Sequence, residues 1–104
     1  MATIGLHLKN CLTFDDPEEA LLALVTMPNL HILITDYNMP IMTGTQLITD
    51  VRKVHPEVET VLMTGFANEK LMLDAIKKQV NYFLEKPLEV EQFNKLMARV
   101  LVSV

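Results

Sequence analysis

Short apolar runs alternate with longer amphipathic segments along most of this chain. The short runs, rich in Leu, Ile and Val, predict strands at residues 11–14, 30–35, 60–64 and 81–85. After each run, apolar residues recur every three or four positions, which predicts helices beginning near residues 17, 43, 68 and 90. Strands that alternate with helices predict an α/β fold, in which a parallel sheet carries helices on both faces and the crossovers are right-handed.

Capping residues and apolar stripes define the predicted helices. Asp16 is the expected N-cap of the first helix, with Pro17 at the first helical position, and the helix should stop near Pro28. The residues at helical spacing that we expect to face the core are Leu47, Ile48, Val51 and Val54 in the second helix, Met72, Ala75 and Ile76 in the third, and Val90, Phe93, Leu96, Met97, Val100 and Leu101 in the last.

Polar residues end three of the predicted strands. Asp36, Thr64 and Lys86 each stand at a strand end, and the carboxyl ends of parallel strands meet at one edge of a sheet. A carboxylate, a hydroxyl and an ammonium at one crevice suit a phosphoryl group, which Asp36 would accept covalently. The alternatives are that Asp36 is a plain turn residue, or that it pairs with Lys86 only to cap the sheet.

Size, charge and composition narrow the function classes. The 104 residues make one compact domain, and the net charge of −4 argues weakly against direct nucleic-acid binding. No run approaches the ~20 apolar residues of a membrane helix. The single Cys11 excludes an internal disulfide, so we expect a cytoplasmic location. An enzyme is disfavoured, because there is no glycine-rich phosphate loop and no nucleophile–histidine–acid or metal-ligand set.

Three motifs resemble the receiver domain of two-component response regulators. They are Asp-Tyr-Asn-Met-Pro at 36–40 with Gly44 following, Met-Thr-Gly at 63–65, and Phe-Leu-Glu-Lys-Pro at 83–87. The resemblance covers about residues 11–102 and implies that 1–104 form a single, flavodoxin-like receiver domain. It also implies a signalling role, in which a histidine kinase or a phosphotransfer protein supplies the phosphoryl group.

The resemblance assigns a role to each matching residue. It makes Asp36 the phosphoacceptor, with Thr64 and Lys86 coordinating the phosphoryl group. Phe83 matches the switch residue that turns inward when the threonine moves. Asn38 matches the residue whose backbone carbonyl binds Mg²⁺, with Asp36 as a second ligand.

Further implications concern the peptide bond after Lys86 and the partner surface. The Lys86–Pro87 bond resembles a cis peptide of the family, a geometry that proline makes less costly. The surface of residues 68–102 would bind an output domain, a partner protein or a second copy of the chain.

The chain departs from the family pattern at its front. Receivers begin with a hydrophobic strand that ends in two acidic residues and is followed by a full helix, but only ten residues precede Cys11. We reject Asp15 and Asp16 as this acidic pair, because Asp16 is explained as a helix cap. Since Mg²⁺ needs carboxylates, its binding should be weak or absent and phosphorylation impaired. The alternative is a pseudo-receiver that binds partners independently of phosphorylation.

Residues 2–8 offer several ways to compensate for the lost strand, which by resemblance would lie between the strands at 11–14 and 30–35. Ile4, Leu6 and Leu8 alternate, which favours a substitute strand. Ile4 and Leu8 also fit a remnant of the first helix, while Gly5 weakens both interpretations. A homodimer formed by exchange of elements between chains is a third solution.

Overall fold

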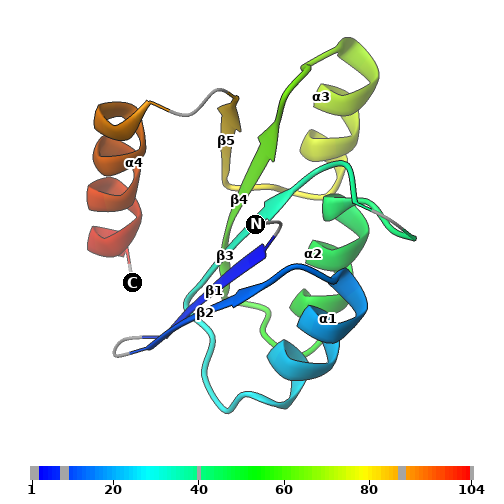
Figure 1. Cartoon of the computed structure of the whole chain (residues 1–104), viewed down its shortest axis with the longest axis vertical. Helices are drawn as coiled ribbons and strands as arrows, with labels where there is room; N and C mark the ends of the chain where they lie inside the picture. The colour runs from blue at the N-terminus through cyan, green and yellow to red at the C-terminus, as the bar shows by residue number, and fades with distance from the viewer. Residues whose placement is uncertain (1–2, 8–9, 40, 87–88, 104) are drawn as a thin grey trace.

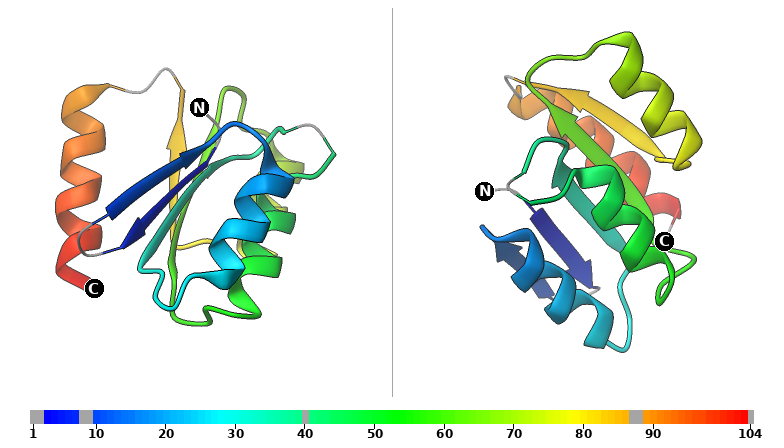
Figure 2. Two further views of the ribbon diagram at one scale, coloured as in Figure 1. Left: turned by 60° about the horizontal axis from the view of Figure 1, so that its bottom comes forward. Right: turned by 90° about the vertical axis from the view of Figure 1, so that its right-hand side faces the viewer.

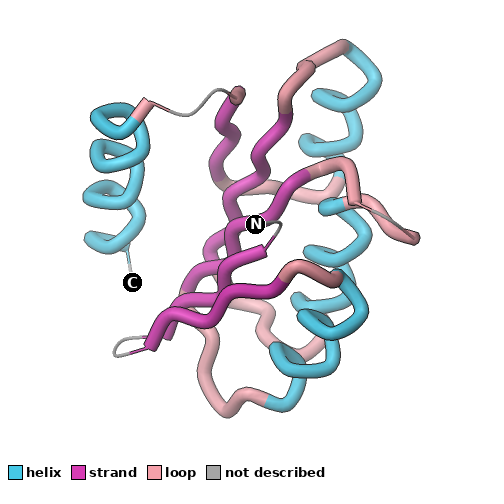
Figure 3. Tube along the Cα trace, viewed as in Figure 1, coloured by secondary structure: helices cyan, strands magenta, loops and turns pink. Residues whose placement is uncertain are grey.

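The structure is a computed structural model that describes residues 3–7, 10–39, 41–86 and 89–103. One mixed sheet carries helices on both faces (Figures 1 and 3). The elements in chain order are β1 (Thr3–His7), β2 (Asn10–Phe14), α1 (Pro17–Thr26), β3 (Ile32–Asp36), α2 (Gly44–Arg52), β4 (Glu59–Thr64), α3 (Glu69–Lys77), β5 (Tyr82–Glu85) and α4 (Val90–Ser103). The four strands and four helices expected from the apolar pattern are all present. No helix of the described residues has the length and apolar character needed to cross a membrane.

The helices form two layers of unequal size. α1, α2 and α3 cover one face of the sheet, and α4 lies against the other, as the two views of Figure 2 show. The core is divided accordingly into two groups of buried residues. The larger group includes Leu24, Leu33, Leu47, Leu62 and Leu71, and the smaller consists of Ile32, Ile34, Val61, Met63 and Leu84, against which Phe93, Leu96 and Met97 of α4 pack. The doubly wound α/β arrangement is therefore confirmed.

β1 is the one strand that runs against the others. The sheet order is β2-β1-β3-β4-β5, and β1 pairs antiparallel with both of its neighbours, whereas β3, β4 and β5 pair in parallel. The register places Ile4 opposite Ile34 and Leu6 opposite Ile32. The substitute-strand interpretation of residues 2–8 is thus confirmed for residues 3–7, and the helix-remnant interpretation is wrong.

The antiparallel direction of β1 has a simple physical cause. A parallel neighbour for β2 would need a crossover of a dozen or more residues, whereas antiparallel strands can be joined by a very short connection. β1 ends at His7 and β2 begins at Asn10, so only the hairpin direction is available. Among the described residues the first parallel strand of the family pattern is absent, as the sequence predicted, and β1 occupies its position in reverse.

Local side-chain contacts fix the helix beginnings as expected. Asp16 is the N-cap of α1, and its carboxylate accepts a hydrogen bond from the backbone N–H of Glu18 at 3.2 Å. α2 begins with a capping box, in which Thr43 and Gln46 satisfy each other's backbone N–H groups. The capping role that the sequence assigned to Asp16 is confirmed.

Some of the predicted core faces are wrong. In α3 the buried residues are Leu71 and Ala75, whereas Met72 and Ile76 are exposed. The buried stripe therefore starts one residue earlier than the apolar pattern indicated. Val54 lies beyond the end of α2 and is exposed. Val90 is exposed because it opens α4 ahead of the packed positions; the side chains of Val100 and Leu101 lie outside the described residues.

The end of α3 offers a test of backbone strain. Gln79 has a φ of 57°, and the backbone N–H of Val80 donates to the carbonyl oxygen of Ala75 at 3.0 Å, which is the Schellman arrangement. Glycine adopts this φ without penalty, so Gln79→Gly should raise the free energy of unfolding by about 0.5–1 kcal/mol in urea titrations. Lys78→Gly is the control, because φ at Lys78 is −88° and glycine there should destabilise.

Candidate functional site

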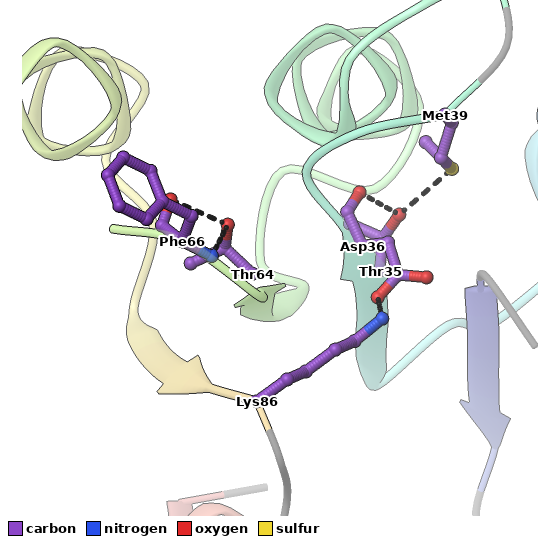
Figure 4. A network of polar contacts seen from close by, with 6 residues as sticks. All are labelled: Thr35, Asp36, Met39, Thr64, Phe66 and Lys86. Carbon is purple, nitrogen blue, oxygen red and sulfur yellow. Dashed lines mark hydrogen bonds and ion pairs between the residues drawn. The ribbon is translucent and has the colours of Figure 1, made fainter. Parts of the chain in front are cut away.

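An ion pair joins the ends of two strands at the carboxyl edge of the sheet. The Lys86 Nζ atom lies 2.6 Å from Asp36 Oδ1, as Figure 4 shows. The Asp36 side chain is 16% exposed and that of Lys86 is 41% exposed, so the pair is open to solvent mainly on the lysine side. The structure thus brings together two of the three polar residues that the sequence placed at strand ends.

Backbone hydrogen bonds hold both residues of this pair in register with β4. The N–H of Tyr37, directly after Asp36, donates to the carbonyl oxygen of Met63 at 2.8 Å. The N–H of Lys86 donates to the carbonyl oxygen of Thr64 at 2.7 Å. The sheet therefore extends its hydrogen bonding past the ends of β3 and β5 and aligns the two charged side chains.

The backbone carbonyl group of Asp36 is closely surrounded by Thr35 and by the start of α2. It accepts a hydrogen bond from the Thr35 hydroxyl at 3.1 Å, and a Cβ atom built at Gly44 would lie only 2.2 Å from the same oxygen. Gly44 also donates its backbone N–H to the carbonyl oxygen of Tyr37 at 2.7 Å. Only glycine allows the start of α2 to approach Asp36 this closely.

The third polar residue of the predicted site is turned to other partners. Thr64 is 2% exposed, and its hydroxyl donates to the carbonyl oxygen of Phe66 at 3.2 Å and accepts from the Phe66 N–H at 3.3 Å. Figure 4 shows this local turn apart from the Asp36–Lys86 pair. Thr64 therefore lies at the correct edge of the sheet, with its hydroxyl engaged by the loop that leads to α3.

The remaining predicted residues lie around this edge. Phe83 on β5 is half-buried and packs against the larger core group. Asn38 is exposed, and its backbone forms an isolated bridge with Thr43. Pro87 lies outside the described residues, so the geometry of the Lys86–Pro87 bond is not described.

The donor set does not fit a magnesium site of the usual kind. Asp36 is a single carboxylate, and its Oδ1 atom is paired with Lys86. β1 begins beside Asp36, since Thr3 pairs with Thr35, and therefore ends at the opposite edge of the sheet. No acidic residues can thus follow the end of β1 into the site. Within the described residues, no three His, Cys, Asp or Glu side chains gather to hold a metal ion.

Sequence reasoning missed a polar cluster next to the acceptor loop. Asp74 Oδ2 accepts hydrogen bonds from the Tyr37 hydroxyl at 3.3 Å and from the Thr45 hydroxyl at 2.6 Å. Burial, the negative charge of Asp74 and this hydrogen bond raise the pKa of the Tyr37 phenol above its ordinary value of 10. The sequence holds no signal for the cluster, because Asp74 lies 29 and 37 residues from its two partners.

Comparison with known proteins identifies the family. Residues 5–99 match the model of the response regulator receiver domain. The chain belongs to the response regulator receiver family. Receiver domains are signalling modules of two-component systems, and they are generally non-catalytic.

Curated relatives are identical to the chain at about a quarter to a third of the aligned residues. It is 32% identical over 93 residues to the two-component response regulator ORR3 of Oryza sativa subsp. indica, covering 88% of this chain and 71% of that protein. It is 27% identical over 92 residues to the DNA-binding transcriptional regulator NtrC of Klebsiella pneumoniae, covering 88% and 19%. This receiver thus spans about a fifth of the larger regulator.

Solved receiver structures share the fold. The structure matches a response regulator receiver domain protein from Clostridium thermocellum with a TM-score of 0.78 and 20% identity, covering 88% of this chain and 74% of that one. It matches the Vibrio cholerae chemotaxis protein CheY4 with a TM-score of 0.76 and 25% identity, covering 86% and 75%. The reversed β1 therefore occurs within an otherwise ordinary receiver architecture.

Proposed function

We propose that this receiver accepts a phosphoryl group on Asp36 from a histidine kinase or a phosphotransfer protein. The observation that carries the proposal is the 2.6 Å pair of Asp36 and Lys86 at the carboxyl edge of the sheet. A carboxylate oxygen of Asp36 would form a bond to phosphorus while the bond between phosphorus and the donor's imidazole nitrogen breaks. Lys86 would then offset the charge of the phosphoryl oxygens, and the Thr64 hydroxyl would bind one of them after leaving Phe66.

The phosphorylated receiver would act on a partner through the surface of residues 68–102. This surface comprises α3, β5 and α4, and the exposed apolar side chains of Ile76 and Val90 lie on it. The charge of an added phosphate at one edge of the sheet can change which conformation such a surface adopts, provided that the residues connecting the two have two arrangements. In this chain the connecting residues would be Thr64 and Phe83. The partner is an output domain, another protein or a second copy of the chain, as expected for a domain that its relatives carry within longer regulators.

Phosphorylation should be slow, because the cation that usually assists it has few ligands here. Mg²⁺ binds carboxylates and phosphate oxygens and neutralises the charge that develops in phosphoryl transfer. Asp36 and the backbone carbonyl of Asn38 are the only protein ligands that the family pattern assigns in this chain. This small number of ligands supports the proposal of an impaired acceptor.

Labelling with a small phosphodonor tests both parts of this proposal. With acetyl phosphate and Mg²⁺, intact-mass measurements should show slow, substoichiometric addition of one phosphoryl group to the parent chain. Asp36→Asn should abolish the addition. Asp50→Asn should not, because the Asp50 side chain pairs with Lys53 at the C-cap of α2, away from the acceptor.

The outcomes separate the two parts. Rapid stoichiometric labelling would show that the acceptor is intact and overturn the impairment. Absence of labelling at every Mg²⁺ concentration would instead overturn the acceptor role.

A pseudo-receiver is the second candidate function. The reversed direction of β1 favours it, because the end of that strand lies at the edge of the sheet opposite Asp36, where an acidic pair could not join the site. In this case a partner protein should bind the parent chain and the Asp36→Asn variant with equal affinity, and phosphodonor should leave that affinity unchanged.

A further inference from the structure

Three segments of the chain meet at the carboxylate of Asp74. Tyr37 belongs to the loop after β3, Thr45 to the first turn of α2, and Asp74 to α3. Both hydroxyls donate to the same oxygen, Asp74 Oδ2, at 3.3 and 2.6 Å. The Thr45 hydroxyl also lies 2.9 Å from that of Thr43, the N-cap of α2. One carboxylate on α3 therefore collects donors from the two segments that follow Asp36.

α3 has few other attachments to the domain. Its buried side chains are Leu71 and Ala75, while Leu73 and Ile76 are 54% and 69% exposed. A groove of about 1030 Å³ runs between α2 and α3, and Asp74 lies on its wall. Leu71 and Ala75 anchor this helix in the core, and the hydrogen bonds of Asp74 add a polar connection from the helix to the acceptor loop.

The two residues that donate to Asp74 are connected to Asp36 through a few backbone contacts. Tyr37 follows Asp36 directly, and its carbonyl oxygen accepts the Gly44 N–H at 2.7 Å. Gly44 in turn packs against the Asp36 carbonyl oxygen and precedes Thr45. A displacement of the Asp36 backbone must therefore move Tyr37, Thr45 or both relative to α3. This connection is separate from the one through Thr64 and Phe83.

We propose that Asp74 is a positioning residue for the acceptor site, which holds the loop after Asp36 against α3 through Tyr37 and Thr45. The role rests on the proposed function, since it matters for signalling only if Asp36 accepts a phosphoryl group. It gives the acceptor a second connection to the partner surface. It also makes the geometry of the loop depend on a carboxylate outside the family motifs.

The electrostatics of Tyr37 agree with this geometry. Burial and the charge of Asp74 raise the pKa of the phenol, so the folded protein favours the neutral, donating form. The stabilisation that this provides is fully present below pH 10 and is lost as the pH rises through the raised pKa. The phenol is therefore in its neutral, donating form throughout the neutral range.

A spectrophotometric titration tests the contact itself. The chain has two tyrosines, so Tyr82→Phe leaves Tyr37 as the only phenol. In this background the phenol should titrate above its ordinary pKa, and Asp74→Asn should lower that pKa. Glu69→Gln is the matched control, because it neutralises a carboxylate on the same helix that forms no hydrogen bond to Tyr37 in the described residues. It should leave the phenol pKa unchanged.

Hydrogen exchange tests whether the contact positions the loop. Asp74→Asn and, separately, Tyr37→Phe should speed amide exchange in residues 37–39 and 41–45 by about tenfold, while Glu69→Gln should not. The labelling rate of Asp36 should fall by about fivefold in the same two variants, relative to the control. Tyr37→Phe serves as the second variant if the Asn substitution prevents folding.

The combined outcomes decide the proposal. It is overturned if Asp74→Asn leaves either the phenol pKa or the loop exchange at the level of the Glu69→Gln control. A parent chain that takes no label at all would sink the proposed function instead. The titration and the exchange would still decide whether Asp74 positions the loop, because neither of them requires phosphorylation.

Discussion

Gly44→Ala should destabilise the domain by about 2–4 kcal/mol, a large fraction of the stability of a chain this size. The new Cβ would lie 2.2 Å from the Asp36 carbonyl oxygen and 2.9 Å from Leu62 Cδ1. The first atom belongs to backbone fixed by the sheet, so the start of α2 must move away from β3. This movement would break the hydrogen bond from the Gly44 N–H to the Tyr37 carbonyl oxygen and loosen the loop that follows Asp36. Urea unfolding followed by circular dichroism measures the loss.

Gly65 provides the matched control for this substitution. It also follows a strand end at the same edge of the sheet, but a Cβ built there meets no atom within 4 Å and its φ is not in the left-handed region. Gly65→Ala should therefore change the free energy of unfolding by less than about 1 kcal/mol, with either sign. Equal effects of the two substitutions would show that the close approach at Gly44 is not what constrains the loop.

Lys86→Ala should lower the rate of phosphoryl labelling of Asp36 by about a hundredfold, if the acceptor role is correct. Its ammonium is the cation that lies against the Asp36 carboxylate, at 2.6 Å. A chain with few magnesium ligands would depend heavily on this charge. Because the side chain is 41% exposed, the loss of stability should stay within about 1 kcal/mol. A radiolabelled phosphodonor gives the sensitivity that the slow reaction needs.

Lys95→Ala is the control for Lys86. The Lys95 side chain pairs with Glu91 on the exposed face of α4, at 3.6 Å, and in the described part of the chain it forms no ion pair with the acceptor site. It should leave labelling unchanged. A labelling rate that is equal in the parent chain and in both lysine variants would mean that Lys86 serves only to cap the sheet.

The apolar pattern was sufficient to predict the order of strands and helices, because the signal for each element lies in its own residues and their immediate neighbours. Asp16 and Thr43 cap their helices through hydrogen bonds to residues two or three positions along the chain, and strand β3 begins with three Ile and Leu residues. The convergence of Asp36 and Lys86 was also accessible, since parallel strands bring their carboxyl ends to one edge.

The features that the apolar pattern did not predict depend on contacts between elements that are distant in the sequence. The alternation of Ile4 and Leu6 indicated a strand. Because the alternating pattern is the same for a parallel and an antiparallel strand, it did not predict the reversed direction of β1. The exposure of Ile76 depends on how α3 rotates against the sheet, which a stripe of apolar residues defines only to within one position. The contacts of Asp74 join residues that are distant in sequence and have no motif.

The reversed β1 also changes how the domain can assemble. In a sheet of parallel strands every pairing must close a long loop, as Ile32 of β3 and Glu59 of β4 still do here. β1 and β2 instead pair from His7 opposite Asn10 outward, and a hairpin of this kind closes within microseconds. An interior position of the sheet, next to β3, is therefore filled by a locally formed hairpin. The slow, entropically costly steps are left to β3, β4 and β5. A hairpin at this position therefore carries a smaller loop-closure cost than a parallel strand there would carry.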